Sequence, residues 1–240
     1  MKILAFDTSS SGVSIALNQG EINIANISTE DNKQSEVLIS KFEEILNQNK
    51  IWYQDLEAIA AISGPGSFTG VRVGLSAARA LKLATNLPLI LISSLEVLAF
   101  KYRNYQGHIF VAIDAKMEEF FVGSFYSQDG EIREVCEAKL ATIDNISNFL
   151  PQQKFLLCGN GKEAVFKSID KNNCECDFDQ QDQIDASLVA ELAHKKIVSQ
   201  EINQSLEAVY IRDPKITARK ATKKRSEEKS GGRGRNRTDA

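Results

Sequence analysis

Apolar residues along this chain follow two patterns, short continuous runs and positions spaced three or four residues apart. Short apolar runs are typical of buried strands, and the wider spacing is typical of helices with one buried face. The runs predict strands at 3–7, 13–17, 57–63, 88–92, 110–114 and 119–126. The spaced positions predict helices at 31–49, 70–85, 93–103 and 186–199. Strands that alternate with helices in this way indicate an α/β fold.

The second predicted helix is apolar around most of its circumference, whereas a surface helix has a single buried stripe. Its polar edge is narrow and consists of Arg72, Ser76 and Arg79. Two faces of this helix are therefore expected to contact protein, one of them the chain's own sheet. Small residues such as Gly70 and Gly74 would let another helix, from this chain or from a partner, approach the second face closely.

The order of elements occurs twice. A strand that ends in Asp7 is followed by a turn and a second strand, and a strand that ends in Asp114 is followed in the same way. Further on, each half has a strand that runs into a glycine turn and a helix, at 64–66 and at 159–161. The repeat predicts two related lobes of the ribonuclease H-like class found in actin, sugar kinases and chaperone ATPases, with the second lobe reduced.

A change in composition marks the end of the expected folded region. Residues 215–240 hold ten Lys or Arg and three Asp or Glu, an excess of +7 against −3 for the whole chain, so the other residues sum to −10. This basic segment lacks periodic apolar residues, which predicts a disordered tail. The tail could contact RNA phosphates or be a solvated end without a specific role. We expect a first lobe at 1–104, a shorter second lobe at 105–214 whose late helix can pack back on the first, and the tail.

The segment Gly64-Pro65-Gly66-Ser67-Phe68-Thr69-Gly70 joins a predicted strand to a helix. Glycines on both sides of a proline permit a sharp turn, and Ser67 or Thr69 can cap the helix. Free N–H groups at such a helix start can bind an anion. However, the glycine spacing is one residue too long for a dinucleotide fingerprint, and no Gly-Lys-Ser/Thr follows. The simpler interpretation is a tight turn that lets the helix pack closely.

Candidate nucleotide-binding residues lie at the strand ends and in the glycine turn. They are Asp7, Thr8, Ser9, Gly64, Gly66 and Asp114. Carboxylates at strand ends beside hydroxyl groups can hold Mg²⁺ and phosphates, but they can also cap hairpin turns through local hydrogen bonds. We favour the capping role, because the second glycine turn has no basic phosphate ligand nearby.

Catalytic and metal-binding patterns are sparse. The two histidines, His108 and His194, are far apart in sequence, and no H-E-x-x-H motif occurs, which disfavours a metalloprotease. The four cysteines show no C-x-x-C spacing and are expected to be reduced thiols. No apolar run approaches the length of a membrane span and the start lacks a secretory pattern, so we expect a cytoplasmic protein. We assign no catalytic residue, no metal ligand and no cofactor to this chain.

Four segments together resemble the TsaB (YeaZ) family over roughly residues 1–213. They are Ile3–Leu17, Gly64–Gly74, the block Ala112-Ile113-Asp114-Ala115-Lys116-Met117-Glu118-Glu119, and Val209-Tyr210-Ile211-Arg212. The chain departs from the family at Lys116, where Arg is usual, at Gln34, where His is frequent, and at Ala208, where Pro is expected. The basic tail lies outside the resemblance.

The resemblance implies a scaffold subunit that activates synthesis of N6-threonylcarbamoyladenosine in tRNA, beside the anticodon. It implies a heterodimer with a catalytic TsaD-type subunit, a TsaE-type ATPase in the same assembly, ATP and metal on those partners, and indirect contact with tRNA. We expect the interface on two helices, at Leu38, Phe42, Ile45, Val71, Gly74, Leu75 and Ala78. Gly74→Trp would then block assembly and leave the fold intact. The chain could pair with itself when the partner is absent.

The alternative from another class is an independent nucleotide-hydrolysing or kinase-like enzyme of the same fold. It rests on Asp7, Thr8, Ser9 and Asp114 and predicts Mg²⁺-dependent ATP turnover by the chain alone. The older glycoprotease label of the family is disfavoured by the absence of a metal-binding histidine motif.

Overall fold

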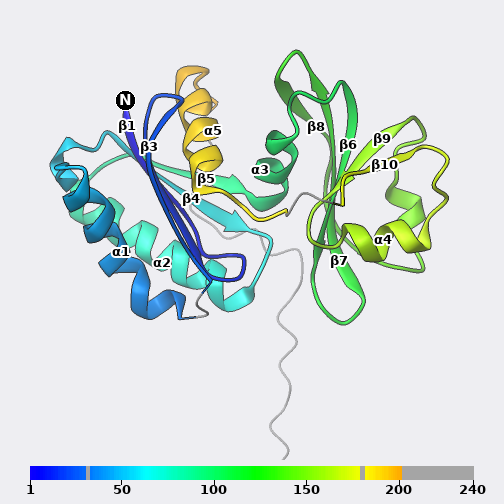
Figure 1. The fold of residues 1–240 in the computed structure, drawn as a ribbon, viewed down its shortest axis with the longest axis horizontal. Helices are drawn as coiled ribbons and strands as arrows, with labels where there is room; N and C mark the ends of the chain where they lie inside the picture. The colour runs from blue at the N-terminus through cyan, green and yellow to red at the C-terminus, as the bar shows by residue number, and fades with distance from the viewer. Residues whose placement is uncertain (31–32, 179–181, 202–240) are drawn as a thin grey trace, which may run out of the picture.

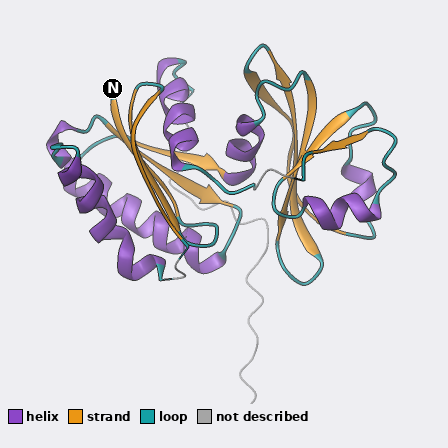
Figure 2. Ribbon diagram, viewed as in Figure 1, coloured by secondary structure: helices purple, strands orange, loops and turns teal. Residues whose placement is uncertain are grey.

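A computed structural model of the chain describes residues 1–30, 33–178 and 182–201. Figure 1 labels the elements along the chain, and Figure 2 shows the strands gathered into two sheets with helices beside them. The first half contains β1 (Lys2–Asp7), β2 (Val13–Gln19), β3 (Ile22–Thr29), α1 (Gln34–Gln48), η1 (Tyr53–Asp55), β4 (Ala58–Gly64), α2 (Phe68–Thr85), β5 (Leu89–Ser93) and α3 (Ser94–Lys101). The second half contains β6 (Gly107–Asp114), β7 (Glu119–Gln128), β8 (Glu131–Thr142), η2 (Ile146–Phe149), β9 (Phe155–Cys158), α4 (Lys162–Ser168), β10 (Cys174–Cys176) and α5 (Ala186–Val198).

The two sheets have the same strand order. Within the described residues, the first sheet runs β3-β2-β1-β4-β5 and the second runs β8-β7-β6-β9-β10. In each, three antiparallel strands are extended by two parallel ones, with β6 in the place of β1. The predicted internal repeat and the α/β fold class with two ribonuclease H-like lobes are thereby confirmed. The second lobe carries fewer helical residues, since α4 has 7 residues where α1 and α2 have 15 and 18.

The strand β1 lies at the centre of the first sheet and is buried on both faces. Its side chains alternate, as strand geometry requires. Leu4 and Phe6 pack with α1 and α2, whereas Ile3 and Ala5 belong to a second core that includes α3 and α5. A strand that is covered on both faces has apolar residues at nearly every position. This is why the sequence pattern predicted β1.

Helices α3 and α5 lie between the two sheets, and α1 and α2 lie on the outer face of the first sheet (Figure 1). The helix α5 follows the second lobe's strands in sequence but packs on β1 and β2 of the first sheet. The N–H of Ala186 donates to Ser14 Oγ at 3.0 Å, and Asn18 Nδ2 donates to the Ser187 carbonyl at 3.1 Å. No helix in the described part of the chain is long and apolar enough to cross a membrane.

Predicted element boundaries differ from the structure in a few places. The first predicted helix began at 31, but residues 31 and 32 lie outside the described residues, and α1 begins at Gln34. The third predicted helix extended to 103, whereas α3 ends at Lys101. No sequence range was predicted for β8, because most of its twelve residues are exposed and it has no buried run. The resemblance block 209–212 and the tail 215–240 lie outside the described residues.

The cap of α5 provides a test of how this helix is held. The Asp185 carboxylate accepts hydrogen bonds from the N–H of Ser187 at 2.8 Å and from Asn26 Nδ2 at 2.9 Å. We expect Asp185→Ala to lower the free energy of unfolding by about 1 to 2 kcal/mol, the usual cost of losing a helix N-cap. Urea unfolding followed by circular dichroism measures this change. Asn26→Ala, which removes only the hydrogen bond from β3 to the cap, should cost less, and equal costs would contradict the capping role.

Candidate functional site

The turn after β1 surrounds a buried carboxylate. Asp7 is 2% exposed. Its Oδ1 accepts hydrogen bonds from the N–H of Ser9 at 2.7 Å and from Ser9 Oγ at 2.6 Å, and its Oδ2 accepts one from Ser10 Oγ at 2.6 Å. Burial raises the pKa of Asp7 above its ordinary value, although the hydrogen bonds from Ser10 and Ser9 lower it in part. The Asp7 carboxylate therefore holds the turn that follows it, through the serine groups at positions 9 and 10.

The glycine segment packs directly against this turn. Thr8 Oγ1 donates to the Gly70 carbonyl at 2.8 Å, and the N–H of Ser67 donates to the Ser9 carbonyl at 2.8 Å. A Cβ at Gly70 would clash with the Thr8 carbonyl, and one at Gly74 would clash with Thr8 Oγ1. The glycine-lined side of α2 therefore contacts the chain's own turn. The expected neighbouring helix is α1 of the same chain, which contacts α2 and shares a core with Ala78.

The start of α2 is capped from within the chain. Ser67 Oγ accepts the N–H of Gly70 at 3.3 Å, which confirms Ser67 as the N-cap. The N–H of Ser67 is bound by the Ser9 carbonyl, so two donors at this helix start, the N–H groups of Ser67 and Gly70, already have partners within the chain. Gly64 has a φ of +102°, a conformation that favours glycine and explains the residue at the end of β4.

The equivalent turn of the second lobe follows β6. Asp114 Oδ1 accepts the N–H of Lys116 at 2.7 Å, and Lys116 Nζ lies 2.8 Å from Asp114 Oδ2. The N–H of Asp114 donates to Asn160 Oδ1 at 2.8 Å, which ties this turn to the second glycine turn. Partial burial raises the pKa of Asp114, but the hydrogen bonds and charge of Lys116 outweigh it and hold the pKa below its ordinary value. Across residues 1–30, 33–178 and 182–201, no group of three or more His, Cys, Asp or Glu is arranged to hold a metal ion.

The residues predicted to contact a partner lie inside the protein. Leu38, Phe42, Ile45, Val71, Leu75 and Ala78 are each 4% exposed or less, and Gly74 is also buried. Most of them belong to the core between the first sheet and the two helices. These side chains cannot contact a partner while the lobe is folded, so their assignment as contact residues is corrected. The expectation that Gly74→Trp spares the fold is also wrong, because Gly74 contacts Thr8.

The exposed sides of α1 and α2 carry different apolar residues. Ile39 is 50% exposed, Leu83 is 86% exposed and Phe68 is 43% exposed. The guanidinium of Arg72 lies 3.7 Å from the centre of the Phe68 ring. The contact residues predicted from the sequence did not include Ile39 or Leu83. Both are apolar residues on the polar side of their helices, and that pattern could have indicated an exposed apolar contact.

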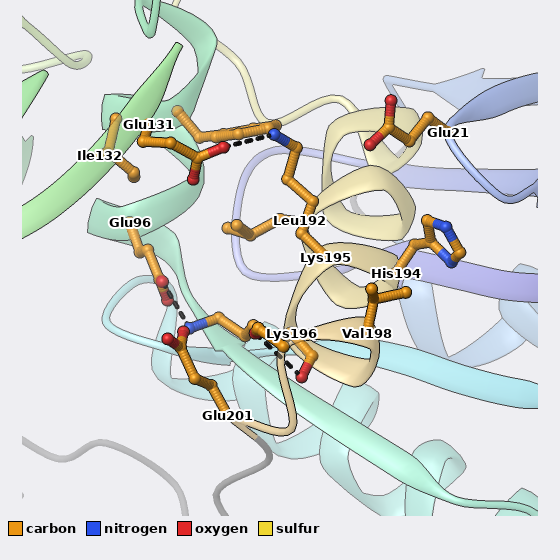
Figure 3. A pocket seen from close by; sticks show the side chains of 12 residues that line it. Glu21, Glu96, Glu131, Ile132, Leu192, His194, Lys195, Lys196, Val198 and Glu201 are labelled. Atoms are coloured by element: carbon orange, nitrogen blue, oxygen red, sulfur yellow. Dashed lines mark hydrogen bonds and ion pairs between the residues drawn. The ribbon is translucent and has the colours of Figure 1, made fainter. Parts of the chain in front are cut away.

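A cavity of about 370 Å³ opens between α5, α3 and the start of β8. Figure 3 shows charged side chains around it, with Lys195 directed to Glu131 and Lys196 to Glu96. These pairs are 3.0 and 2.6 Å long. The cavity is also lined by His194, whose Nδ1 is buried and has no hydrogen-bond partner among the residues that the structure describes. None of the predicted site residues lies in this cavity, and its charges are mostly used to join α5 to its neighbours.

Comparisons with known proteins bear on the family. A family model described as "TsaD: tRNA N6-adenosine threonylcarbamoyltransferase" matches residues 28–231. A protein of Bacillus subtilis named tRNA threonylcarbamoyladenosine biosynthesis protein TsaB is 35% identical over 136 residues, which cover 56% of this chain and 59% of that protein. The chain thus spans about three fifths of that relative's length. The protein of the same name from Haemophilus influenzae is 30% identical over 183 residues, covering 72% of this chain and 77% of the relative.

The fold also has a close counterpart among solved structures. The structure titled "YeaZ from Pseudomonas aeruginosa" superposes with a TM-score of 0.76 at 22% identity, covering 87% of this chain and 99% of that one. At this identity the likeness bears on the fold, and it supports the two-lobed architecture.

The contact between α2 and the first turn predicts a specific sensitivity to added volume. We expect Gly70→Ala to lower the free energy of unfolding by about 1 to 3 kcal/mol, because its Cβ would displace the Thr8 carbonyl. Denaturant unfolding measures the loss. Ser76→Ala on the exposed side of α2 is the matched control and should change stability by less than about 0.5 kcal/mol. Equal effects of the two substitutions would show that the helix is free to move away from the turn.

The buried Asp7 predicts a pH dependence of stability. Because its pKa is raised in the folded state, the folded protein holds this proton more tightly than the unfolded chain. Its contribution is therefore full below the ordinary aspartate pKa of about 4 and is lost as the pH rises through the raised value. Wild type should lose stability relative to Asp7→Asn over this range, as measured by urea unfolding at a series of pH values. Parallel curves for the two proteins would contradict the raised pKa.

Proposed function

The chain belongs to the TsaB family, and on that premise we propose that it is a non-catalytic subunit of the assembly that makes N6-threonylcarbamoyladenosine in tRNA. Its relatives carry the name tRNA threonylcarbamoyladenosine biosynthesis protein. The modified adenosine lies beside the anticodon. In this proposal the chain activates a TsaD-type catalytic subunit and contacts tRNA through the complex.

One observation carries the non-catalytic role. The polar groups that could bind a nucleotide at the first strand end are already bound within the chain, Asp7 by Ser9 and Ser10, and the start of α2 by Ser9 and Ser67. A phosphate or metal ion at this position would have to displace these short hydrogen bonds and separate α2 from the turn. We therefore infer that ATP and metal act on the partner subunits, among them a TsaE-type ATPase.

We assign the partner surface to the exposed sides of α1 and α2. The buried sides of both helices form the first lobe's core, which holds their exposed sides in a fixed arrangement. Ile39 and Leu83 leave apolar area in water, which favours burial against a partner. A helical surface on a TsaD-type subunit would cover it, and a second copy of this chain would cover it when that partner is absent.

This surface predicts a selective loss of assembly. We expect the double variant Ile39→Glu and Leu83→Glu to weaken binding to the TsaD-type subunit at least about tenfold, because it places two carboxylates in an apolar contact, a penalty of about 1.4 kcal/mol or more. Isothermal titration calorimetry with the two purified subunits measures the affinity. The melting temperature of the isolated variant should stay close to that of wild type, since both side chains are exposed.

Val135→Glu is the matched control. Val135 is 51% exposed on β8 in the other lobe and is as apolar as the two tested residues. It should bind the partner like wild type. If the control weakened binding as much as the double variant, the interface would lie elsewhere. ATP turnover by the well-folded chain alone, lost in Asp7→Ala, would instead support the enzyme alternative.

A further inference from the structure

A second buried carboxylate, outside the predicted site, is bound by donors from two parts of the chain, at 101–102 and at 159–162. The side chain of Asp182 is 0% exposed. Its Oδ1 accepts a hydrogen bond from the Tyr102 hydroxyl at 2.6 Å, and its Oδ2 accepts one from the N–H of Gly159 at 2.8 Å. Lys162 Nζ lies 2.9 Å from Oδ2, and Lys101 Nζ lies 3.7 Å from Oδ1. Two ammonium groups, a hydroxyl and a backbone N–H thus surround one carboxylate.

These donors depend on an anion at this position. The side chain of Lys162 is only 8% exposed, and leaving a buried ammonium without its counter-charge is costly. Burial, the hydrogen bond to Asp182 and the charge of Asp182 raise the pKa of Tyr102, so its hydroxyl stays protonated and donates. Gly159 has a φ of +99°, and a Cβ there would clash with the backbone of Ala112. The geometry that presents the Gly159 N–H to the anion therefore requires glycine.

The carboxylate joins elements that are far apart in sequence. Gly159 and Lys162 flank the second lobe's glycine turn, between β9 and α4, and Tyr102 follows the end of α3. Asp182 lies on the segment that leads to α5, which packs on the first sheet. In the first lobe, the corresponding turn donates the N–H of Ser67 to the Ser9 carbonyl. Each glycine turn thus binds an oxygen atom that the chain itself supplies.

We propose that Gly159, Lys162, Lys101 and Tyr102 form an anion-binding site whose resident ligand is the Asp182 carboxylate. Its occupation holds the segment leading to α5 against the second lobe. The chemistry of the site suits a small oxyanion, because a free carboxylate or an inorganic phosphate can accept the same hydrogen bonds once the Asp182 side chain is removed. This site is separate from the exposed side of α1 and α2, so the proposal does not depend on the proposed function.

Anion rescue of Asp182→Gly in the full chain tests the proposal. We expect this variant to melt at a lower temperature than wild type, and sodium formate to raise its melting temperature saturably. The expected rise is about 3 to 6 °C at a formate concentration ten times its dissociation constant. This is the shift in melting temperature expected when a ligand binds only the folded state of a protein of this size. Sodium chloride at equal ionic strength should give no such rise. Acetate and phosphate, tested in parallel, report how large an anion the site accepts.

Glu131→Gly is the matched control, because it removes a carboxylate from an exposed pair with Lys195. Its melting temperature should respond equally to formate and chloride. A rise for Asp182→Gly that chloride reproduces, or that Glu131→Gly shares, would overturn the anion site. The absence of any rise in formate would overturn it as well.

Asp182→Asn tests the link to α5 in a variant that keeps the shape of the side chain. Its neutral amide removes the negative charge that lies beside Lys162 and Lys101, so we expect faster hydrogen exchange at the amides of Gly159 and Ala186 than in wild type. Amides of β1, in the first sheet, should keep their wild-type protection. Unchanged exchange at both Gly159 and Ala186 would contradict the role of Asp182 in holding this segment.

Discussion

The close contact between the helix α2 and the turn after β1 is the constraint on which the first lobe depends. At positions 66, 70 and 74, any side chain would clash with Ser9 or Thr8, so glycine at these positions permits the close approach. That approach allows direct hydrogen bonds between turn and helix and aligns α2 along the sheet beside α1. The buried sides of α1 and α2 then complete one core with the first sheet. Because this core is close-packed, the exposed sides of the two helices are held in one orientation.

The same contact uses polar groups at the end of β1 and at the start of α2 for hydrogen bonds within the chain. A helix start and a strand-end carboxylate are groups that proteins use for phosphates and metal ions. Here, the oxygen atoms of Asp7 and the capped start of α2 bind Ser9, Ser10 and Ser67. A scaffold can use such an arrangement for rigidity, since each internal hydrogen bond stabilises the turn that the helix packs against.

The helix α5 connects the lobes by charge as well as by packing. It pairs with α3 through Lys196–Glu96, with the residues just after α3 through Glu191–Arg103, and with β8 through Lys195–Glu131. Two of these pairs have side chains less than a third exposed, so solvent screens them less than typical surface pairs. The pair Lys195–Glu131 and the buried Asp182 carboxylate join α5, which packs on the first sheet, to the second lobe. The two sheets are therefore held in one arrangement across α3 and α5.

The sequence alone determined the class of fold, the internal repeat and most elements, because buried strands and amphipathic helices leave their period in the order of apolar residues. It also restricted the cap of α2 to Ser67 or Thr69, of which the structure has Ser67, and favoured Asp7 as a turn residue, since these roles involve neighbours a few residues away. Tertiary structure alone decided which side of each helix meets the core, so Leu38 and Val71 proved to be buried while Ile39 and Leu83 are exposed. It also decided that Asp182 meets Tyr102 and Lys162. Such contacts join residues far apart in the chain, and a local pattern of apolar residues carries no information on which distant residues meet.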